Sequence, residues 1–486
     1  MIGAIIMAQP TLAEPQKTSI FVTADGRNLT FTFILVTTLF LLWGFCNGMI
    51  DVMDKHFQDE LGLTKSQSAW VQFAHYLGYF LMSMPAGWLA SKLGYKGGII
   101  TGLLLVAVGG FLFVPATWVN AMVKSGQVSP NTAFLAFLTG VCVIATGLTF
   151  LETIANPYTT VLGDPRFAAT RINLAQSCNG IGWIFGPIVG SMFFYSTNAA
   201  GQSTGSETLH IPYVGVGIVV LILAVIFYFA EVPDIKAEDD YHLDGSSAAE
   251  PAQSIWSHPH FVMAVAAQFL YVAAQAGIFS FFINYMTSEL PAIPAWFQTS
   301  ITDMAASAGF LREWMTGWFE TSKAGVLALS DKGASNLASL GFVCFLVGRF
   351  TGAGILRKYS AHKVLGLYAA LNVLATFIVF LKLGWLSVAC VFLSFFFMSI
   401  MFPTIFALGI FGLGARAKKA SAFIVMAIMG GAILPKLMGY VADQYDMSRG
   451  FIVPMFCFIF VAFYGFNWPK FSKSDSLVSV KATGGH

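Results

Sequence analysis

The chain has 486 residues, of which 56% are hydrophobic and 10% charged, and its formal net charge is +2 at pH 7. Soluble domains carry about 25% charged residues, so this composition excludes a soluble fold and indicates a polytopic membrane protein. The small charge, without a basic aromatic patch, gives no reason to expect a nucleic-acid partner. The six cysteines lie in apolar segments without the paired spacing of disulfides or zinc sites, so we expect no metal and no cofactor.

Twelve segments have the length and apolarity of a membrane-crossing helix, which needs about 20 mainly apolar residues. They lie near residues 30–54, 67–91, 97–117, 132–162, 171–195, 211–230, 259–288, 333–357, 362–381, 384–411, 418–443 and 449–468. We therefore expect an all-α polytopic membrane protein in which twelve transmembrane helices form two six-helix, pseudo-symmetric halves.

The expected domains are a cytosolic N-terminal tail at 1–29, a first half at 30–230, a cytosolic linker at 231–257, a second half at 258–468 and a cytosolic C-terminal tail at 469–486. The linker is acidic and rich in Pro, Ser and Ala, as connecting segments are. Within the second half, 289–332 is too polar to span and carries Trp296, Trp314 and Trp318 at roughly helical spacing. We expect an insertion on the outer face, built from one or two amphipathic helices or from a loop.

The orientation follows from the distribution of positive charge. Of the 26 Lys and Arg residues, 17 lie on the side that holds both termini, 8 lie on the other side, and Lys436 lies within the membrane. Because cytoplasmic loops carry an excess of positive charge, both termini are predicted to be cytoplasmic. The first 29 residues lack the pattern of a cleaved signal peptide and are expected to remain as a tail.

The two halves repeat in sequence. With a shift of 246 residues, Pro157, Leu162 and Gly163 fall on Pro403, Leu408 and Gly409, and with a shift of 248, Pro187 falls on Pro435. Parallel repeats of this kind are typical of alternating-access carriers, whose substrate site lies near the membrane midplane between the halves.

Glu152 is a carboxylate inside the apolar fourth segment. A charge at mid-membrane costs about 2.5 to 3.5 kcal/mol on insertion scales, so such residues usually serve an ion or substrate path; the alternative is a carboxyl that bonds a neighbouring helix. The neutral form of a carboxyl is favoured in an apolar cavity, so Glu152 is a candidate to load a proton on one side and release it on the other. Asp51, nearer the outer end of the first helix, is the second candidate.

Polar stripes run along four of the expected helices. They comprise Asn47, Asp51 and Asp54; Glu152 and Asn156; Gln176, Asn179 and Trp183; and Gln268, Tyr271 and Gln275, each at helical spacing. Such stripes face a cavity or another helix rather than lipid. Sugars need flat apolar faces for the ring and amides or carboxylates for the hydroxyls, which these stripes offer; hydrogen bonds between helices are the alternative.

His75 and Lys436 are two further ionisable residues at a similar depth, about seven or eight residues inside the outer ends of their helices. As a pair they would form an outer gate or tune Asp51. The alternative is a packing histidine and a lysine that extends outward to the interface.

Several motifs together resemble the fucose/galactose/glucose:H+ symporter family of the major facilitator superfamily. They are Leu42-Trp43…Asn47…Asp51, Tyr79-Phe80…Pro85-Ala-Gly87, Tyr95-Lys96…Gly98-Ile-Ile-Thr-Gly102, Leu151-Glu-Thr-Ile-Ala-Asn-Pro157, Asn173-Leu-Ala-Gln176…Asn179, Gln268…Tyr271…Gln275, Gly348-Arg-Phe-Thr-Gly352, His362-Lys-Val-Leu365, Pro403-Thr-Ile-Phe406 and Phe423-Ile-Val-Met426. The resemblance covers roughly residues 35–195 and 256–465.

The resemblance implies a proton-coupled sugar carrier in which Asp51 and Glu152 are the functional carboxylates. It also implies that the second and eleventh helices face each other across the halves. The residues that match the family's sugar cavity are Trp43, Asn47, Gln176 and Asn179. Three positions depart from the family pattern of Asn, Trp and Tyr, namely Gly48, Phe279 and Phe402, and these departures argue against L-fucose itself as the substrate.

We therefore predict a secondary active importer that couples a hexose or related sugar to protons, not an enzyme, since no nucleophile, metal triad or phosphate loop accompanies the acids. The alternatives are Na+ coupling, because Glu152, Asn156, Gln176 and Asn179 offer hard oxygens, and a sugar-sensing, transport-like receptor. The expected partners are a small-molecule sugar, H+ or Na+, and membrane lipid. By analogy with such carriers we expect a monomer in the bacterial inner membrane.

Overall fold

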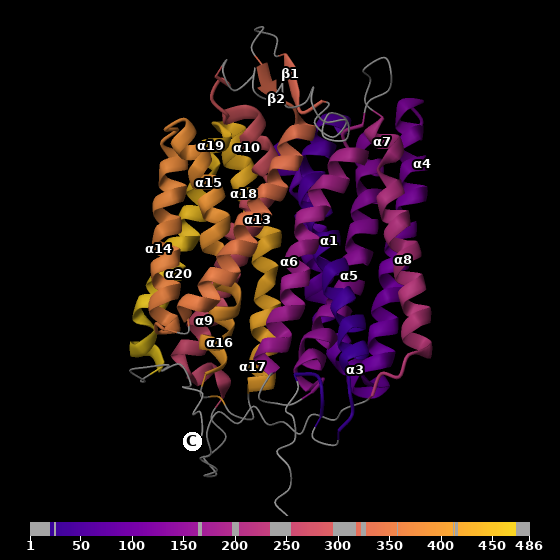
Figure 1. Cartoon of the computed structure of the whole chain (residues 1–486). Coiled ribbons are helices and arrows are strands. Elements are labelled where there is room, and N and C mark those ends of the chain that lie inside the picture. The colour runs from indigo at the N-terminus through magenta and orange to yellow at the C-terminus, as the bar shows by residue number, and fades with distance from the viewer. Residues whose placement is uncertain are drawn as a thin grey trace, which may run out of the picture.

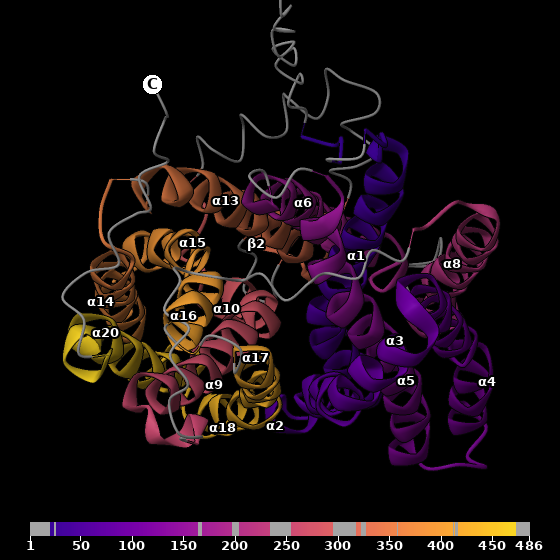
Figure 2. The same ribbon diagram turned by 90° about the horizontal axis from the view of Figure 1, so that it is seen from below.

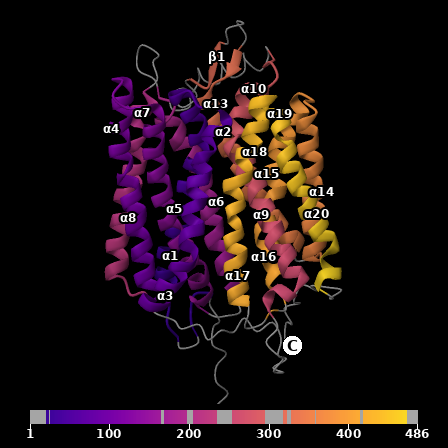
Figure 3. The same cartoon turned by 180° about the vertical axis from the view of Figure 1, so that it is seen from behind.

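The computed structural model describes residues 20–23, 26–163, 168–196, 204–233, 254–294, 317–321, 327–356, 358–411, 413 and 417–472. Over these residues the chain is almost entirely helical and forms two bundles that stand side by side (Figure 1; Figure 3). This arrangement confirms the expected fold class.

The first bundle contains α1 (Thr30–Leu61), α2 (Lys65–Ser68), α3 (Trp70–Phe111), α4 (Phe113–Lys124), α5 (Pro130–Val161), α6 (Ala168–Phe193), α7 (Gly205–Thr208) and α8 (His210–Phe229). The helix α3 includes two of the expected membrane helices. They meet at Gly94, whose φ of 71° lies in the left-handed region that glycine adopts without strain.

The second bundle contains the short helix η2 (Ile255–Ser257), α9 (Pro259–Ser280), α10 (Phe282–Glu289), α13 (Asp331–Leu356), α14 (Ala361–Phe380), α15 (Trp385–Met398), α16 (Met401–Ile410), α17 (Ala417–Met426), η4 (Ala427–Met429), α18 (Gly430–Gln444), α19 (Met447–Gly450) and α20 (Ile452–Ser472). Several expected spans are interrupted: the seventh at Phe281 and the tenth around Ile400.

Ten helical segments among the described residues are long and apolar enough to cross a membrane. The expected segments at 67–91 and 171–195 fall below that level of apolarity, yet both are helical in α3 and α6. They carry polar stripes, such as Gln72 and His75 on α3, that face the protein instead of lipid. A criterion based on apolarity alone therefore misses membrane helices that line the interior of the protein.

Residues between α10 and α13 include two short antiparallel strands, β1 (Phe319–Thr321) and β2 (Leu327–Leu329), with Phe319 opposite Leu329. They lie beyond the helix ends at one side of the molecule, which we call the hairpin face (Figure 1). The described part of the expected insertion thus contains strands. Of the three tryptophans on which the amphipathic-helix expectation rested, Trp318 directly precedes β1, while Trp296 and Trp314 lie outside the described residues.

The bundles meet along several helix pairs. α6 packs against α13, α18 packs against α2 and α3, and α1 contacts α9. Viewed along the bundle axes, the pairs α6–α13 and α18–α2 lie where the two groups of helices adjoin (Figure 2). The expected facing of the second and eleventh helices is confirmed: a Cβ on Gly431 of α18 would clash with the ring of Tyr76 on α3.

Candidate functional site

Glu152 lies in a small pocket between α1 and α5. The pocket is lined by Leu39, Phe40, Trp43, Leu151, Glu152 and Ala155. The α1 residues Leu39 and Trp43 are one helical turn apart, as are Leu151 and Ala155 on α5, so each helix presents one continuous strip to the pocket. Glu152 is half-buried and forms no ion pair with any described residue. Within the described part of the chain, its carboxyl therefore has no basic partner.

A tyrosine on α3 connects the pocket's indole to its carboxyl. The Trp43 Nε1–H donates to the Tyr79 hydroxyl oxygen at 2.7 Å, and the same hydroxyl approaches the Glu152 carboxyl. Tyr79 is 5% exposed, so it contacts these two pocket residues from within the protein. Sequence reasoning did not select Tyr79 as a site residue. The signal was present, because Gln72, His75, Tyr76 and Tyr79 recur at i, i+3, i+4 and i+7.

A chain of hydrogen bonds runs from the turn of Glu152 to the second half. The Asn156 Nδ2 donates to the Glu152 carbonyl oxygen at 3.0 Å, and the Gln176 Nε2 donates to Asn156 Oδ1 at 3.0 Å. The Arg349 guanidinium of α13 donates to the Gln176 carbonyl oxygen at 3.3 Å. The structure thus brings Glu152, Asn156 and Gln176, from two of the predicted stripes, together. Arg349 is a further polar group that we had not selected, although an arginine inside an apolar segment is itself a signal.

Asp51 lies on α1, about two helical turns beyond Trp43, and is 5% exposed. Its Oδ1 accepts from Gln72 Nε2 of α3 at 3.1 Å, whereas its Oδ2 has no partner among the described residues. Asn47 is also buried, and its Oδ1 has no partner there either. Buried polar atoms normally have a hydrogen-bond partner, so unsatisfied acceptors on one helix face are typical of a site that awaits a ligand or proton.

Other predicted side chains hold helices together. Asn179 Nδ2 donates to the Phe40 carbonyl oxygen at 3.3 Å and so joins α6 to α1. The Tyr271 hydroxyl donates to the Met398 carbonyl oxygen at 2.9 Å, within the second half. These two hydrogen bonds agree with the alternative given for the polar stripes, namely hydrogen bonds between helices. Gln268, on the same stripe as Tyr271, is fully buried with neither amide atom bonded to a described residue, and Gln275 is half-buried.

Phe279 belongs to an aromatic cluster that crosses between the halves. Its ring lies 4.5 Å from that of Phe395, 4.9 Å from that of Phe342 and 5.4 Å from that of Trp183, centroid to centroid. Trp183 is on α6 and the other rings are in the second half. Phe279 is 4% exposed, so it seals the interface between the halves. Phe402, the other aromatic departure, is half-buried against the core.

His75 and Lys436 have separate partners. The His75 ring is buried with its centroid 5.0 Å from those of Tyr76 and Tyr79, and its Nδ1 has no hydrogen-bond partner among the described residues. Lys436 Nζ lies 3.9 Å from the ring centroid of Trp70, at the start of α3. Lys436 therefore joins the halves through a cation–π contact, and the structure shows no hydrogen bond or ion pair between the two residues of the predicted gate.

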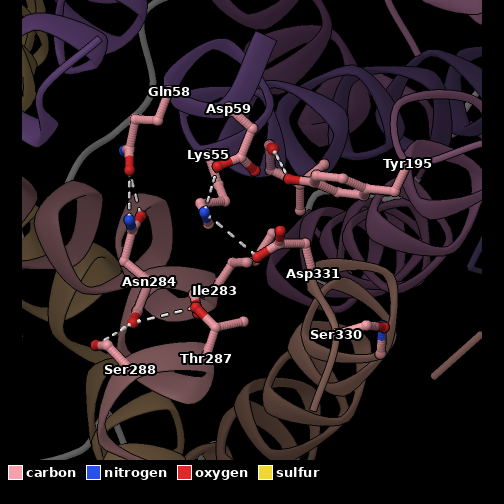
Figure 4. A network of polar contacts seen from close by, with 12 residues as sticks. Lys55, Gln58, Asp59, Tyr195, Ile283, Asn284, Thr287, Ser288, Ser330 and Asp331 are labelled. Atoms are coloured by element: carbon pink, nitrogen blue, oxygen red, sulfur yellow. Dashed lines mark hydrogen bonds and ion pairs between the residues drawn. The ribbon is translucent and has the colours of Figure 1, made fainter. Parts of the chain in front are cut away.

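Polar contacts close the hairpin face between the halves (Figure 4). Gln58 of α1 and Asn284 of α10 bond through both side-chain amides, at 2.5 and 3.4 Å. Lys55 Nζ lies 2.5 Å from Asp59 on its own helix and 3.6 Å from Asp331 of the second half. Residues 55, 58 and 59 lie at the end of α1. This helix end therefore supplies the first bundle's side of these contacts.

A second set of contacts completes the closure. Asp443 of α18 accepts the backbone N–H groups of Lys65 and Ser66 at 3.0 and 2.8 Å. The Lys65 ammonium lies 3.7 Å from the same carboxylate. We call the contacts of Lys55, Gln58, Lys65 and Ser66 with Asn284, Asp331 and Asp443 the hairpin-face seam.

Comparison with known proteins gives consistent matches. The model of the Major Facilitator Superfamily matches residues 32–320. The chain is 32% identical to the L-fucose-proton symporter of Escherichia coli over 452 residues, 89% of this chain and 92% of that protein. It is 30% identical to the glucose/galactose transporter of Brucella abortus over 444 residues, 91% of this chain and 95% of the relative.

Solved structures agree. The structure of FucP, a Major Facilitator Superfamily transporter, in the outward conformation aligns with a TM-score of 0.61 at 31% identity, covering 91% of this chain and 99% of that one. The D-xylose-proton symporter aligns with a TM-score of 0.61 at 13% identity, covering 90% and 97%, and shows the shared fold. The resemblance read from the motifs is confirmed.

Proposed function

Because the chain belongs to the major facilitator superfamily, within which it groups with the fucose/galactose/glucose:H+ symporters, we propose that it imports a hexose or related sugar together with protons by alternating access. The relatives named above are sugar transporters, and one is a proton symporter. They are transporters and not enzymes, and this chain is one as well. In this chain the pocket of Glu152 would serve the same activity.

The observation that carries this proposal is the surroundings of Glu152. Its carboxyl lines a pocket with an indole, a tyrosine hydroxyl nearby and two amides behind it, and no described cation neutralises it. An unpaired carboxyl in apolar surroundings is stable when it carries a proton. The flat face of Trp43 suits the C–H side of a sugar ring, and the amides suit its hydroxyls.

In the proposed cycle, Glu152 binds the transported proton and Asp51 responds to the sugar. Trp43, Asn47, Asn156, Gln176 and Gln275 offer ring and hydroxyl contacts, while Phe279 and Phe402 bound the site with apolar surface. Protonation and sugar binding together leave the cavity neutral, so that the halves can reorient without moving an uncompensated charge through the membrane. One chain supplies both halves of the site, which supports a monomer as the working unit.

We further propose that the hairpin face is periplasmic and that both termini are cytoplasmic, in a bacterial inner membrane. The excess of Lys and Arg at the opposite side supports this orientation. The two halves that move in this cycle are the ranges expected from the sequence, 30–230 and 258–468. The seam described above is then the closed external gate.

The function is tested with the purified chain in proteoliposomes and a panel of labelled sugars: D-glucose, D-galactose, L-fucose, N-acetyl-D-glucosamine and a disaccharide. We expect uphill accumulation of at least one hexose under an inward proton gradient, abolished by an uncoupler and unchanged when choline replaces sodium. Accumulation that follows sodium and survives the uncoupler would favour the Na+-coupled alternative. Binding without flux for every sugar would favour a receptor.

A further inference from the structure

Asp54 is a buried acid that the site described above does not use. It is 0% exposed, and neither carboxyl oxygen has a hydrogen-bond partner among the described residues. It lies on α1 between Asp51 and Gln58, in the series 47, 51, 54 and 58, whose spacings of four, three and four keep all four side chains on one helix face. The stripe therefore runs from the cavity to the hairpin-face seam.

The side chain opposite Asp54 belongs to the other half. The Ser280 hydroxyl, at the end of α9, approaches the Asp54 carboxyl, and it is itself fully buried without a bonded partner. One turn farther on, Gln58 bonds Asn284. Asp54 and Gln58 are four residues apart, as are Ser280 and Asn284, so the two pairs form consecutive rungs between the halves. Asp54 thus lies in the seam itself.

The charged and titratable neighbours of Asp54 do not compensate a negative charge. Asp51 is an acid one turn away on α1. Tyr195, beyond the end of α6, donates its hydroxyl to the Val52 carbonyl oxygen at 2.8 Å. The ammonium of Lys55 lies between Asp59 and Asp331. Among the described residues the Ser280 hydroxyl is the donor that faces this carboxyl and no cation pairs with it. A buried carboxylate with so little compensation costs several kcal/mol.

We propose that Asp54 is a second proton-binding residue, which must be protonated for the hairpin-face seam to close. When the halves part at this face, Ser280 moves away with the second half and Asp54 meets water, where its ionised form is stable. Closure returns it to the apolar seam, and the acid takes up a proton from the side that has just closed. The inference rests on the proposed function only in requiring a state open at the hairpin face.

The test measures seam opening by the distance between two spin labels. Labels are placed through Ser125→Cys, at the exposed end of α4, and Leu383→Cys, an exposed position between α14 and α15, in a chain whose six native cysteines are replaced. The protein is reconstituted in lipid nanodiscs without sugar and without a proton gradient. The open fraction is then measured from pH 5 to pH 9.

Protons bind more tightly to the closed state, so raising the pH must favour the open state. We expect the open-to-closed ratio to rise at least about tenfold over this range, by linkage. Asp54→Asn keeps the shape of the neutral acid and should remove most of this rise, leaving only the smaller response of Glu152 and Asp51. Asp446→Asn, the control at an acid of the hairpin face whose contacts with Lys382 and Arg449 stay inside the second half, should keep the pH response.

Two results would overturn the proposal: an open fraction independent of pH in the chain with Asp54 intact, or a full pH response in Asp54→Asn. The first needs no substitution at Asp54, so it decides the question even if that variant misfolds. Since no sugar is present, the outcome is separate from the transport assay. A chain that carries no sugar but opens with pH through Asp54 would refute the proposed function alone.

Discussion

At the scale of single residues, the pocket of Glu152 depends on one hydroxyl. The Tyr79 oxygen accepts from the Trp43 indole and leaves its own hydrogen for the carboxyl or for a sugar oxygen. It thereby orients the indole face that the sugar ring would contact. A tyrosine without its hydroxyl keeps the packing of α3 and removes only this link.

We expect Tyr79→Phe to weaken sugar binding by roughly 5- to 30-fold, because the hydrogen that Tyr79 offers a sugar oxygen is removed, and an acceptor left without its donor costs about 1 to 2 kcal/mol. The measurement is the half-saturation concentration for counterflow exchange of whichever sugar the chain accumulates. Tyr359→Phe, at an exposed tyrosine, is the control and should leave exchange unchanged. Equal affinities in both variants would remove Tyr79 from the site.

Helical spacing placed Glu152 and Asn156 on one face of their helix, and Gln176 and Asn179 on one face of the next. It did not separate Gln176 from Asn179, whose amide bonds a carbonyl of α1 instead. A stripe that faces a cavity and one that faces a neighbouring helix have the same spacing, so only the packing distinguishes them.

At the scale of elements, the position of Asn47 and Asp51 is set by how closely α1 approaches α6. A Cβ on Gly186 would lie 2.6 Å from the Gly48 backbone, closer than side chains are found. The helices are therefore in backbone contact at this point. Gly48 is also held small by this approach, because its own Cβ would lie 2.8 Å from the Trp183 carbonyl oxygen.

Gly186→Ala should lower the thermal stability, because one methyl group forced into a packed contact costs about 1 to 3 kcal/mol. Gly87→Ala is the matched control, since a Cβ there meets nothing within 4 Å. The melting temperature in detergent is the readout, and we expect a clear decrease for the first variant and none for the second. Equal melting temperatures would mean that α1 and α6 separate without cost.

The sequence predicted where the helices lie better than where they break. The segment expected at 132–162 is α5, Pro130–Val161, whereas the segment expected at 259–288 divides into α9 and α10 at Phe281. Hydrophobic periodicity continues through such a break, because both parts bury the same face. The strands at 319–321 and 327–329 are too short to give an alternating pattern of their own.

At the scale of the whole molecule, two bundles are held together at the hairpin face by contacts that must break when that face opens. Asp443 holds the backbone of α2 through two N–H groups, so α18 and the connection between α1 and α3 move together only while those bonds last. Lys382 pairs with Asp446 and Glu289 inside the second half and does not cross the seam. Of these contacts, only those of Asp443 therefore report on closure of the seam.

Asp443→Ala should therefore expose the Lys65 and Ser66 amides to solvent. We expect their hydrogen–deuterium exchange to accelerate at least about fivefold, as the loss of a bond worth about 1 kcal/mol predicts. Asp446→Ala, on the same face, removes the cap of α19 and should change exchange there without affecting residues 65 and 66. Unchanged exchange in Asp443→Ala would show that other contacts keep the seam shut.

The coupling of proton to sugar through Glu152 is tested most directly by recording proton uptake when sugar is added to proteoliposomes under no imposed gradient. The unsubstituted chain should alkalinise the medium as sugar enters. Glu152→Gln should show no sugar-driven proton movement and no uphill accumulation, yet retain counterflow exchange, whereas the exposed control Glu231→Gln should behave like the unsubstituted chain. Sugar-driven proton uptake that persists in Glu152→Gln would contradict the assignment.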